Sequence, residues 1–246
     1  MQRLAPIFIL LLAGSGGAAA QTFDVASIRA AQPGRDSVEV VPGSVTMRNL
    51  RMTACIRWAY GVQDFQISGP GWLNEARFDI VAKAGTQAPE ADLRKMMQAL
   101  LADRFKLVVH RETKEMTALI LTVGKNGHKL KPTDVEGSPS FQTGKLNLTG
   151  KGATIAQLTE FLSRELRQPV VDKTGLTGRF DYFLDINAYV TEEIRKTETP
   201  NGGPPAEAPS IIAQAIQAQL GLKIEPHKAP VEMLVIDSIE KTPTEN

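Results

Sequence analysis

Apolar and polar positions alternate with two distinct periods along the chain, and each period predicts one kind of secondary structure. After Pro89, apolar residues recur at intervals of three and four, which indicates an amphipathic helix. Pro89 suits the first turn of this helix, and acidic residues follow it at the positive end of the helix dipole. Residues 44–49 instead alternate apolar and polar side chains, as in a strand with one buried face. The apolar positions of the helix are Leu93, Met96, Met97, Leu100 and Leu101.

Three further helices are predicted from the same kind of signal. A short one has Thr53 as its N-cap and ends before Gly61, because glycine readily takes the left-handed conformation that closes a helix. A second has a run of apolar residues on one face and is stopped by Pro169. The last opens at Ser210 as its N-cap and ends at Gly221.

Two segments are expected to form hairpins. The segment 105–124 has one apolar run before and another after the charged stretch RETKE (111–115). The segment 222–240 has the same layout around KAPVE (228–232). In both segments the central stretch is interpreted as the turn between two antiparallel strands.

The chain contains two similar halves, which points to an internal duplication. The segment ARFDIVAKA (76–84) matches GRFDYFLDI (178–186), and the segment 105–125 matches 222–241. The first pair is 102 residues apart and the second 117, so the second half carries 15 extra residues. They fall in 191–209, which is rich in proline, glycine and charge and is expected to be a disordered loop.

Strands and helices follow one order in each half: strand, helix, strand, strand, helix, strand, strand. This order, with neighbouring strands joined by short turns, predicts an α+β fold in which each half is a mostly antiparallel sheet with two helices. The first repeat is placed at 21–138 and the second at 139–246, with a turn-rich junction at 133–144.

The first 20 residues have the layout of a signal peptide: Arg3 near the start, a short apolar run, and small residues that end in alanines 18–20. No later segment is apolar enough to span a bilayer. Removal of 1–20 would leave as many basic as acidic residues, which argues against nucleic acid as a partner. We therefore expect an extracytoplasmic protein, either periplasmic or secreted.

Three segments carry a resemblance to a known family: GWLNEARFDIVAKA (71–84), LLADRFKLVVHRETKEM (100–116) and QPVVDKTGLTGRFDYFLDI (168–186). They resemble an uncharacterised family of secreted soil-bacterial proteins, whose domains are sometimes attached to membrane metallopeptidases of the β-lactam-sensor type. The resemblance spans nearly the whole chain after the signal segment. It implies an extracytoplasmic location and a sensing or binding role, and it supplies no catalytic residue.

Histidine and glutamate recur at one spacing in the two repeated segments, as His110 with Glu115 and His227 with Glu232. One interpretation is a metal site or an acid/base pair. The other is a pair of cross-strand contacts that close two equivalent hairpins, each worth about 0.2–1 kcal/mol. Each segment supplies two ligands at most, whereas a structural zinc site usually has four, so the structural interpretation is favoured. These four residues are the candidate surface site.

The sequence shows no complete catalytic motif. Cys55 lies among apolar residues and is interpreted as a buried structural cysteine. Asp79 and Asp181 each follow an Arg-Phe pair, and they are interpreted as fixing strand starts rather than as a glycosidase pair. Four aromatic residues allow either a ligand groove or, more commonly, core packing: Trp58, Tyr60, Phe65 and Trp72.

These observations favour a non-catalytic binding or sensing domain outside the cytoplasm. No cofactor is expected, and the ligand would be a protein, a peptide or a glycan. The alternative is a structural module that docks protein partners, with exposed sheet edges as the docking surface. A hydrolase with a scattered site ranks last. Enzyme activity is therefore left open and is not favoured.

Overall fold

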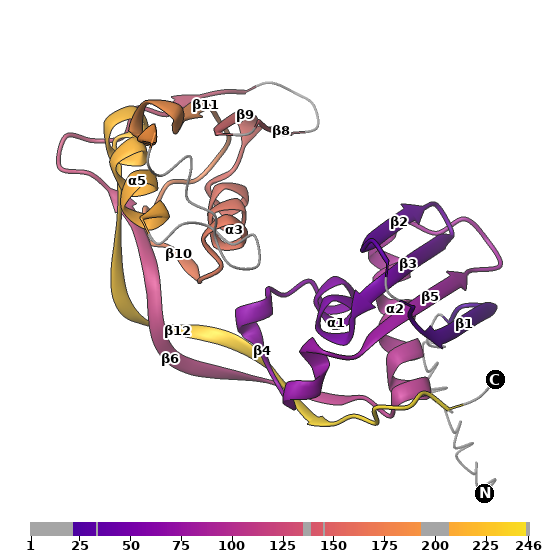
Figure 1. Cartoon of the computed structure of the whole chain (residues 1–246). Helices are drawn as coiled ribbons and strands as arrows, with labels where there is room; N and C mark the ends of the chain where they lie inside the picture. The colour runs from indigo at the N-terminus through magenta and orange to yellow at the C-terminus, as the bar shows by residue number, and fades with distance from the viewer. Residues whose placement is uncertain (1–21, 33, 135–138, 145, 193–206, 245–246) are drawn as a thin grey trace, which may run out of the picture.

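Two lobes joined by a long two-stranded ribbon make up the part of the chain that the computed structural model describes (Figure 1). Each lobe combines an antiparallel sheet with helices, which confirms the predicted α+β fold of two similar halves. The predicted signal segment 1–20 lies outside the described residues, as does most of the predicted loop at 191–209. The described residues are 22–32, 34–134, 139–144, 146–192 and 207–244.

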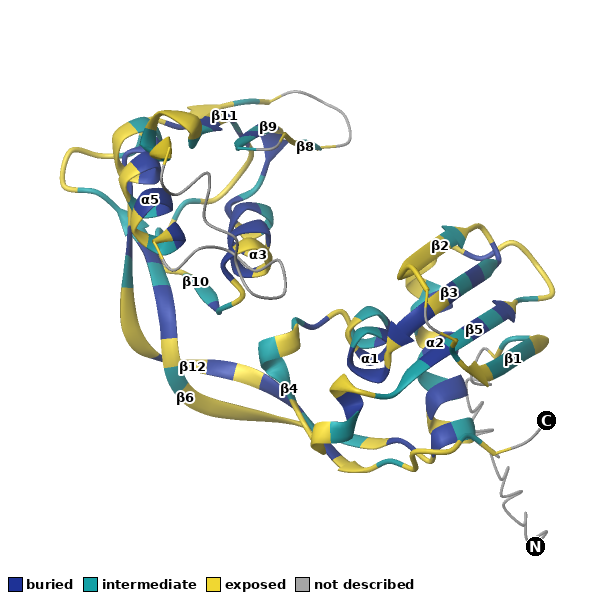
Figure 2. Ribbon diagram, viewed as in Figure 1, coloured by how far each residue is buried: buried dark blue, intermediate teal, exposed yellow. Residues whose placement is uncertain are grey.

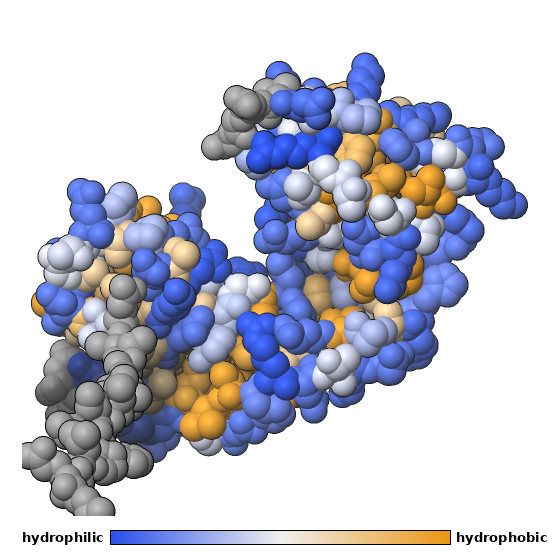
Figure 3. All heavy atoms as spheres, turned by 180° about the vertical axis from the view of Figure 1, so that it is seen from behind, coloured by the Kyte–Doolittle hydropathy of each residue, from blue (hydrophilic) through white to orange (hydrophobic). Residues whose placement is uncertain are grey.

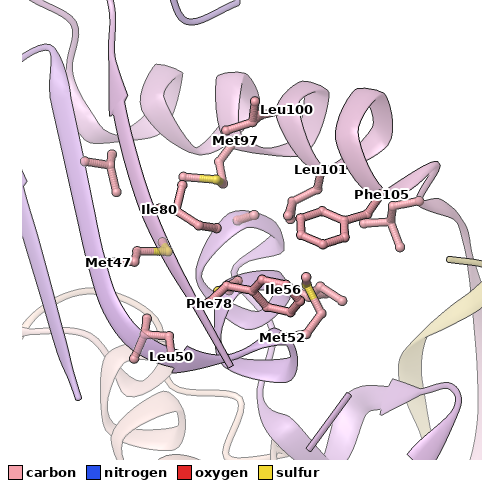
Figure 4. Packing of buried hydrophobic residues seen from close by; sticks show 14 of the residues in the cluster. Met47, Leu50, Met52, Ile56, Phe78, Ile80, Met97, Leu100, Leu101 and Phe105 are labelled. Carbon is pink, nitrogen blue, oxygen red and sulfur yellow. The ribbon is translucent and has the colours of Figure 1, made fainter. Parts of the chain in front are cut away.

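Lobe 1 packs two helices on one face of a four-stranded antiparallel sheet. Its main elements are β1 (Val25–Ala30), β2 (Ser37–Val41), β3 (Ser44–Arg51), α1 (Met52–Tyr60), β5 (Arg77–Lys83) and α2 (Glu90–Phe105). The strand order is β1-β5-β3-β2. Figure 4 shows side chains of α2 pointing toward Met47 and Ile80 of the sheet, with Ile56 of α1 beside them. Phe78 and Phe105 pack edge to face with ring centroids 5.0 Å apart.

Lobe 2 repeats this plan with the sheet order β7-β11-β9-β8. Its elements are β7 (Lys131–Pro132), β8 (Ser140–Thr143), β9 (Asn147–Ala153), α3 (Ile155–Leu166), β11 (Phe180–Asp185), and α5 (Ala208–Ala215), which continues into a π-helical turn at Ile216–Leu220. Leu158 and Leu162 of α3 are fully buried in the core of this lobe, as their helical spacing predicts. Each lobe thus has its own hydrophobic core.

A third sheet joins the lobes and is built on two long strands, β6 (Val108–Val123) and β12 (Leu222–Ser238). They pair antiparallel along nearly their whole length. Two short strands flank them. The strand β4 (Ile67–Ser68) from lobe 1 runs parallel to β12, and β10 (Val170–Asp172) from lobe 2 runs parallel to β6.

The two predicted hairpins are wrong, because each segment forms one continuous strand. RETKE (111–115) lies in the middle of β6 and KAPVE (228–232) lies in the middle of β12. Neither stretch contains the Asn-Gly, Asp-Gly or Gly-Gly pair that favours a tight hairpin turn. The two segments pair with each other instead, so RETKE becomes exposed strand in the ribbon.

Each long strand contributes to both lobes. Leu234 of β12 enters the core of lobe 1, while Leu119 of β6 enters the core of lobe 2. At the centre of the ladder Lys114 lies opposite Val231. These two residues are 117 positions apart, which is also the offset between the two matching sequence segments. The ladder therefore pairs equivalent stretches of the two halves symmetrically, and each half gives a strand to the other.

The aspartate of the repeated Arg-Phe-Asp sequence accepts a hydrogen bond from a bulged backbone residue in both lobes. The N–H of Asn49 donates to Asp79 Oδ1 (2.7 Å), and that of Gly152 donates to Asp181 Oδ1 (2.8 Å). Asn49 and Gly152 have positive φ angles of 53° and 59°, at points where the strand register shifts. A bulged residue leaves its N–H outside the ladder, and the aspartate supplies the acceptor that this group needs.

The C-terminal ends predicted for two helices are confirmed, whereas two predicted N-caps are wrong. Gly61 and Gly221 close their helices in the left-handed conformation, as predicted. Thr53 is not an N-cap, because it lies inside α1 and its hydroxyl donates to Oδ1 of Asn74 (2.8 Å), at the end of the 3₁₀ helix Gly71–Asn74. Ser210 lies inside α5, where its hydroxyl donates to the backbone oxygen of the N-cap residue Glu207 (2.8 Å).

We predict that Asp79→Ala destabilises the protein by about 1–3 kcal/mol, because the N–H of the buried Asn49 loses its acceptor. Asp181→Ala should have a similar effect through lobe 2. Urea denaturation followed by circular dichroism measures both. The control is Asp103→Ala, which removes a surface ion pair with Arg104 and should change stability by less than about 0.5 kcal/mol. An Asp79→Ala protein as stable as the control would contradict this role.

Candidate functional site

The two histidines of the predicted surface site lie on the ribbon, far from each other. His110 lies opposite Val235, while His227 lies opposite Ala118, which is eight residues further along β6 than His110. At roughly 3.4 Å per residue, the two imidazoles sit about 27 Å apart along the ribbon. They therefore cannot share a metal ion or act on one substrate group.

The two glutamates of that predicted site lie closer together, on the other face of the ribbon. Glu232 lies opposite Thr113, two positions from Glu115. Glu232 forms an ion pair with Arg111, and since both side chains are about half exposed, the pair contributes little to stability. Among the described residues, no group of three or more His, Cys, Asp or Glu is placed to hold a metal ion.

His110 has a carboxylate partner across the ribbon. Its Nδ1 lies 2.8 Å from Oδ1 and 3.0 Å from Oδ2 of Asp237. This hydrogen bond raises the pKa of His110, loss of hydration opposes the rise, and the charges of Asp237 and Glu112 add to it. The result is a local ion pair on an exposed surface, distinct from the His110–Glu115 pair that the sequence suggested.

A cleft of about 670 Å³ between the two lobes is lined by side chains of one predominant charge. Of the nine described residues around it, five are arginines and one is an acid. Its volume is within the range of small-molecule sites, about 300–1,000 Å³. The hollow between the lobes is bordered mainly by hydrophilic side chains (Figure 3). We call it the arginine cleft, and its lining residues are Arg51, Arg57, Gln63, Asp64, Phe65, Asn74, Arg77, Arg164 and Arg167.

Three arginines reach the cleft from lobe 1. Arg51 is the N-cap of α1, and Arg57 lies in the last turn of the same helix. Arg57 approaches Asp64 to 3.5 Å, and because that carboxylate is 64% exposed, the pair leaves much of the arginine charge available to a ligand. Arg77, at the start of β5, donates to the backbone oxygen of Asn49 (2.6 Å) and forms an ion pair with Asp36 (2.8 Å), and these two contacts fix its direction.

Two more arginines reach the cleft from the end of α3 in lobe 2. The guanidinium of Arg164 lies over the ring of Phe161, 5.4 Å from its centroid, and its Nε lies 3.3 Å from Glu165. Arg167 closes the helix in the left-handed conformation. The negative end of a helix dipole favours cations, so this end of α3 suits both arginines.

A second pocket of about 310 Å³ continues from the arginine cleft toward the ribbon. Gln63 and Phe65 line both spaces. The second pocket also has an apolar side, which includes Val171 of β10 and Val231 of β12. A ligand with anionic groups among the arginines therefore has room for an apolar part beside them.

Cys55 is excluded as a nucleophile. It is completely buried in α1, and burial raises the pKa of its thiol to about 12. A cysteine acts as a nucleophile in its thiolate form, and this thiol stays protonated at neutral pH. The interpretation of Cys55 as a structural core residue is confirmed.

The sequence did not reveal the arginine cleft. Its arginines are spread from 51 to 167 over several elements, so no spacing links them. They converge because the ribbon sets the two lobes beside each other, and the ribbon itself was predicted as two hairpins. Of the aromatic residues considered from sequence, Phe65 lines the cleft, whereas Trp58, Tyr60 and Trp72 pack against the core of lobe 1.

Comparison with known proteins places the chain in a family. Residues 53–239 match the model of a family described as "Protein of unknown function (DUF3738)", and the chain belongs to this family. This confirms the resemblance to an uncharacterised family. None of the curated proteins and none of the solved structures matches the chain. No helix in the described part of the chain is long and apolar enough to cross a membrane.

We predict that Asp237→Asn lowers the pKa of His110 toward the ordinary value of 6.5, because the carboxylate hydrogen bond is lost. Titration of the His110 ring by NMR measures this. Glu112→Gln is the matched comparison and should lower the pKa less, since Glu112 acts through its charge alone.

The raised pKa also fixes the sign of a pH effect on stability. A histidine whose pKa is higher in the folded state stabilises that state below its unfolded pKa of about 6.5, and the contribution disappears as the pH rises through the folded value. A His110 pKa that is unchanged in Asp237→Asn would contradict the assignment.

Proposed function

We propose that this DUF3738 protein is an extracytoplasmic binding protein whose ligand is an acidic peptide or an acidic glycan held in the arginine cleft. The observation that carries the proposal is the convergence of five arginines from two lobes on one cleft that contains a single acid among its described lining residues. The signal-like segment at 1–20 supports a location outside the cytoplasm, where peptides and glycans are available.

Arginine is well suited to an anionic ligand. Its guanidinium keeps its charge at all physiological pH values and offers a planar set of donors that matches a carboxylate, phosphate or sulfate group. Arg57, Arg77 and Arg164 each contact one carboxylate. These carboxylates belong to Asp64, Asp36 and Glu165 and are about half exposed or more, so the ion pairs are weak and the cleft keeps an excess of positive charge. The walls of a cleft concentrate this field, which favours the approach of an anion.

The same lining favours binding over chemistry. Guanidinium groups hold their protons near neutral pH, so the arginines can orient an anion but cannot exchange protons with it. Asp64 lies beside Arg57, and Gln63 and Asn74 carry neutral amides. These side chains supply charge and hydrogen bonds, which is what a non-catalytic site requires.

The placement of the arginines on both lobes supports a sensing role for the bound state. A ligand that contacts Arg57 and Arg164 at once would tie lobe 1 to lobe 2 across the cleft. Between the lobes the chain is connected by a ribbon whose central part is only β6 and β12 wide. Ligand binding would then shift the lobes toward one relative position, which a partner could recognise.

The test is calorimetry with two probes, a hexaglutamate peptide and a sulfated tetrasaccharide. We expect at least one to bind, with an affinity that falls as salt is added. The double variant Arg57→Gln/Arg164→Gln should lose about tenfold or more in affinity, because hydrogen bonds to charged groups contribute about 1.5–3 kcal/mol each. Both substitutions keep the long polar side chain and remove its charge.

The controls separate cleft binding from general charge attraction. Arg29→Gln removes one exposed arginine of β1, outside the cleft, and should leave the affinity unchanged. Hexaglutamine, the neutral counterpart of the acidic probe, should not bind. Failure of both anionic probes to bind, or equal binding by the double variant and the wild type, would sink the proposal.

A further inference from the structure

The middle of β6 has an open backbone edge. Alternate residues of an antiparallel strand direct their N–H and C=O groups toward the partner strand or away from it. The N–H of Leu119 donates to the backbone oxygen of Pro169 (2.8 Å), on the side away from β12. By this alternation Arg111, Thr113 and Glu115 also point their backbone groups away from β12. In the part of the chain that the structure describes, β10 pairs with this edge at 170–172 and no strand covers the earlier residues.

The outer edge of β12, unlike that of β6, has few free backbone N–H groups in the middle of the ribbon. Pro226 and Pro230 lie opposite Leu119 and Glu115, at positions where an N–H would point outward. A proline at such a position breaks no ladder hydrogen bond and offers no donor to an added strand. The strand β4 covers the same edge further along, beside Leu234. One edge of the ribbon is thus closed by proline and the other is left open.

The open stretch RETKE (111–115) is complementary to itself. If Thr113 lies opposite the Thr113 of a second, antiparallel copy, Arg111 faces Glu115 and Glu112 faces Lys114, and each pair occurs twice. All five residues are exposed, as Figure 2 shows for this stretch of β6. The same arrangement sets the outward backbone groups of Thr113 against those of its copy. Charge and hydrogen bonding therefore favour one register.

We propose that two copies of this chain form a symmetric dimer by pairing the open edges of β6 about a two-fold axis at Thr113. The sheet would then run through both molecules as β12, β6, β6 and β12. Such a contact uses the same surface on both copies, so it closes into a dimer rather than a filament. This inference is independent of the arginine cleft, because none of the residues 111–115 lines that cleft.

Like charges oppose the neighbouring registers. A shift of two residues in one direction places Glu112 opposite Glu112 of the copy, and a shift in the other places Lys114 opposite Lys114. Charged residues on an edge usually keep unrelated strands away. Here the alternation of signs also selects one partner, a second copy, in one register.

The first test blocks the edge. Sedimentation equilibrium of the wild-type chain should show a mass that rises from monomer to dimer with concentration. Thr113→Pro should stay monomeric at the same concentrations, because it removes the central outward N–H while sparing the ladder to β12. Thr113→Ala is the control and should dimerise like the wild type. Circular dichroism shows that each variant is folded.

The second test exchanges charges. Lys114→Glu places like charges opposite each other twice in the dimer, and it should weaken dimerisation roughly tenfold or more. The double variant Glu112→Lys/Lys114→Glu restores opposite charges in the proposed register and should recover the wild-type affinity. Within the chain Glu112 and Lys114 lie opposite Met233 and Val231, so the exchange breaks no ion pair across the ribbon.

The third test reports the register directly. Thr113→Cys should form a disulfide-linked dimer under mild oxidation, since the two cysteines would face each other on the axis. Thr117→Cys lies on the same edge away from the axis and should not, while the native Cys55 is buried. A wild-type chain that is monomeric at every concentration, or a dimer that Thr113→Pro leaves intact, would overturn the proposal. Failure of the charge exchange to recover the affinity would overturn the register.

Discussion

The antiparallel pairing of β6 with β12 is the constraint on which the rest of the structure depends. A two-stranded ribbon alone is marginally stable in water. Here each end of the ribbon is anchored, because β12 gives Leu234 to the core of lobe 1 and β6 gives Leu119 to the core of lobe 2. The short strands β4 and β10 add a third strand at opposite ends. In the middle of the ribbon the β6 stretch 111–115 is exposed, whereas Ala229, Val231 and Met233 of β12 are buried in a small hydrophobic cluster of their own.

The exchange of strands makes the two lobes depend on each other. Lobe 1 is built mainly from the first half of the chain, yet its core takes Leu234 and Ile236 from the last strand. That core is complete only when β12 supplies these two side chains. Contacts so far apart in sequence are slow to form, because closing a long loop costs entropy before the contact stabilises anything. The shared strands also connect the two lobes through one continuous pair of strands.

Local sequence patterns predicted the helices and the central strands of the two lobes correctly. They predicted the ribbon wrongly, for a physical reason. The spacing of Leu93, Met97 and Leu101 identified α2, because a helix shows its buried face within a few turns. The choice between two hairpins and two long paired strands depends on which distant segment each strand meets. In RETKE all side chains are exposed in either arrangement, so hydrophobic periodicity could not decide between them. The arginines converge only because the ribbon places the two lobes beside each other, so the arginine cleft could not be predicted from local sequence patterns either.

The arginine cleft also shows how little the net charge of a chain says about one site. Without residues 1–20 the sequence has equal numbers of basic and acidic residues, which argued against nucleic acid as a partner. Charges on an exposed surface are largely screened beyond about 8 Å at physiological ionic strength. Distant acidic side chains therefore do little to offset the five guanidinium groups gathered around one cleft, and the three carboxylates that contact these groups are about half exposed or more. The balanced total argues against a long polyanion lying across the whole surface, whereas the local excess suits an anion small enough to fit between the lobes.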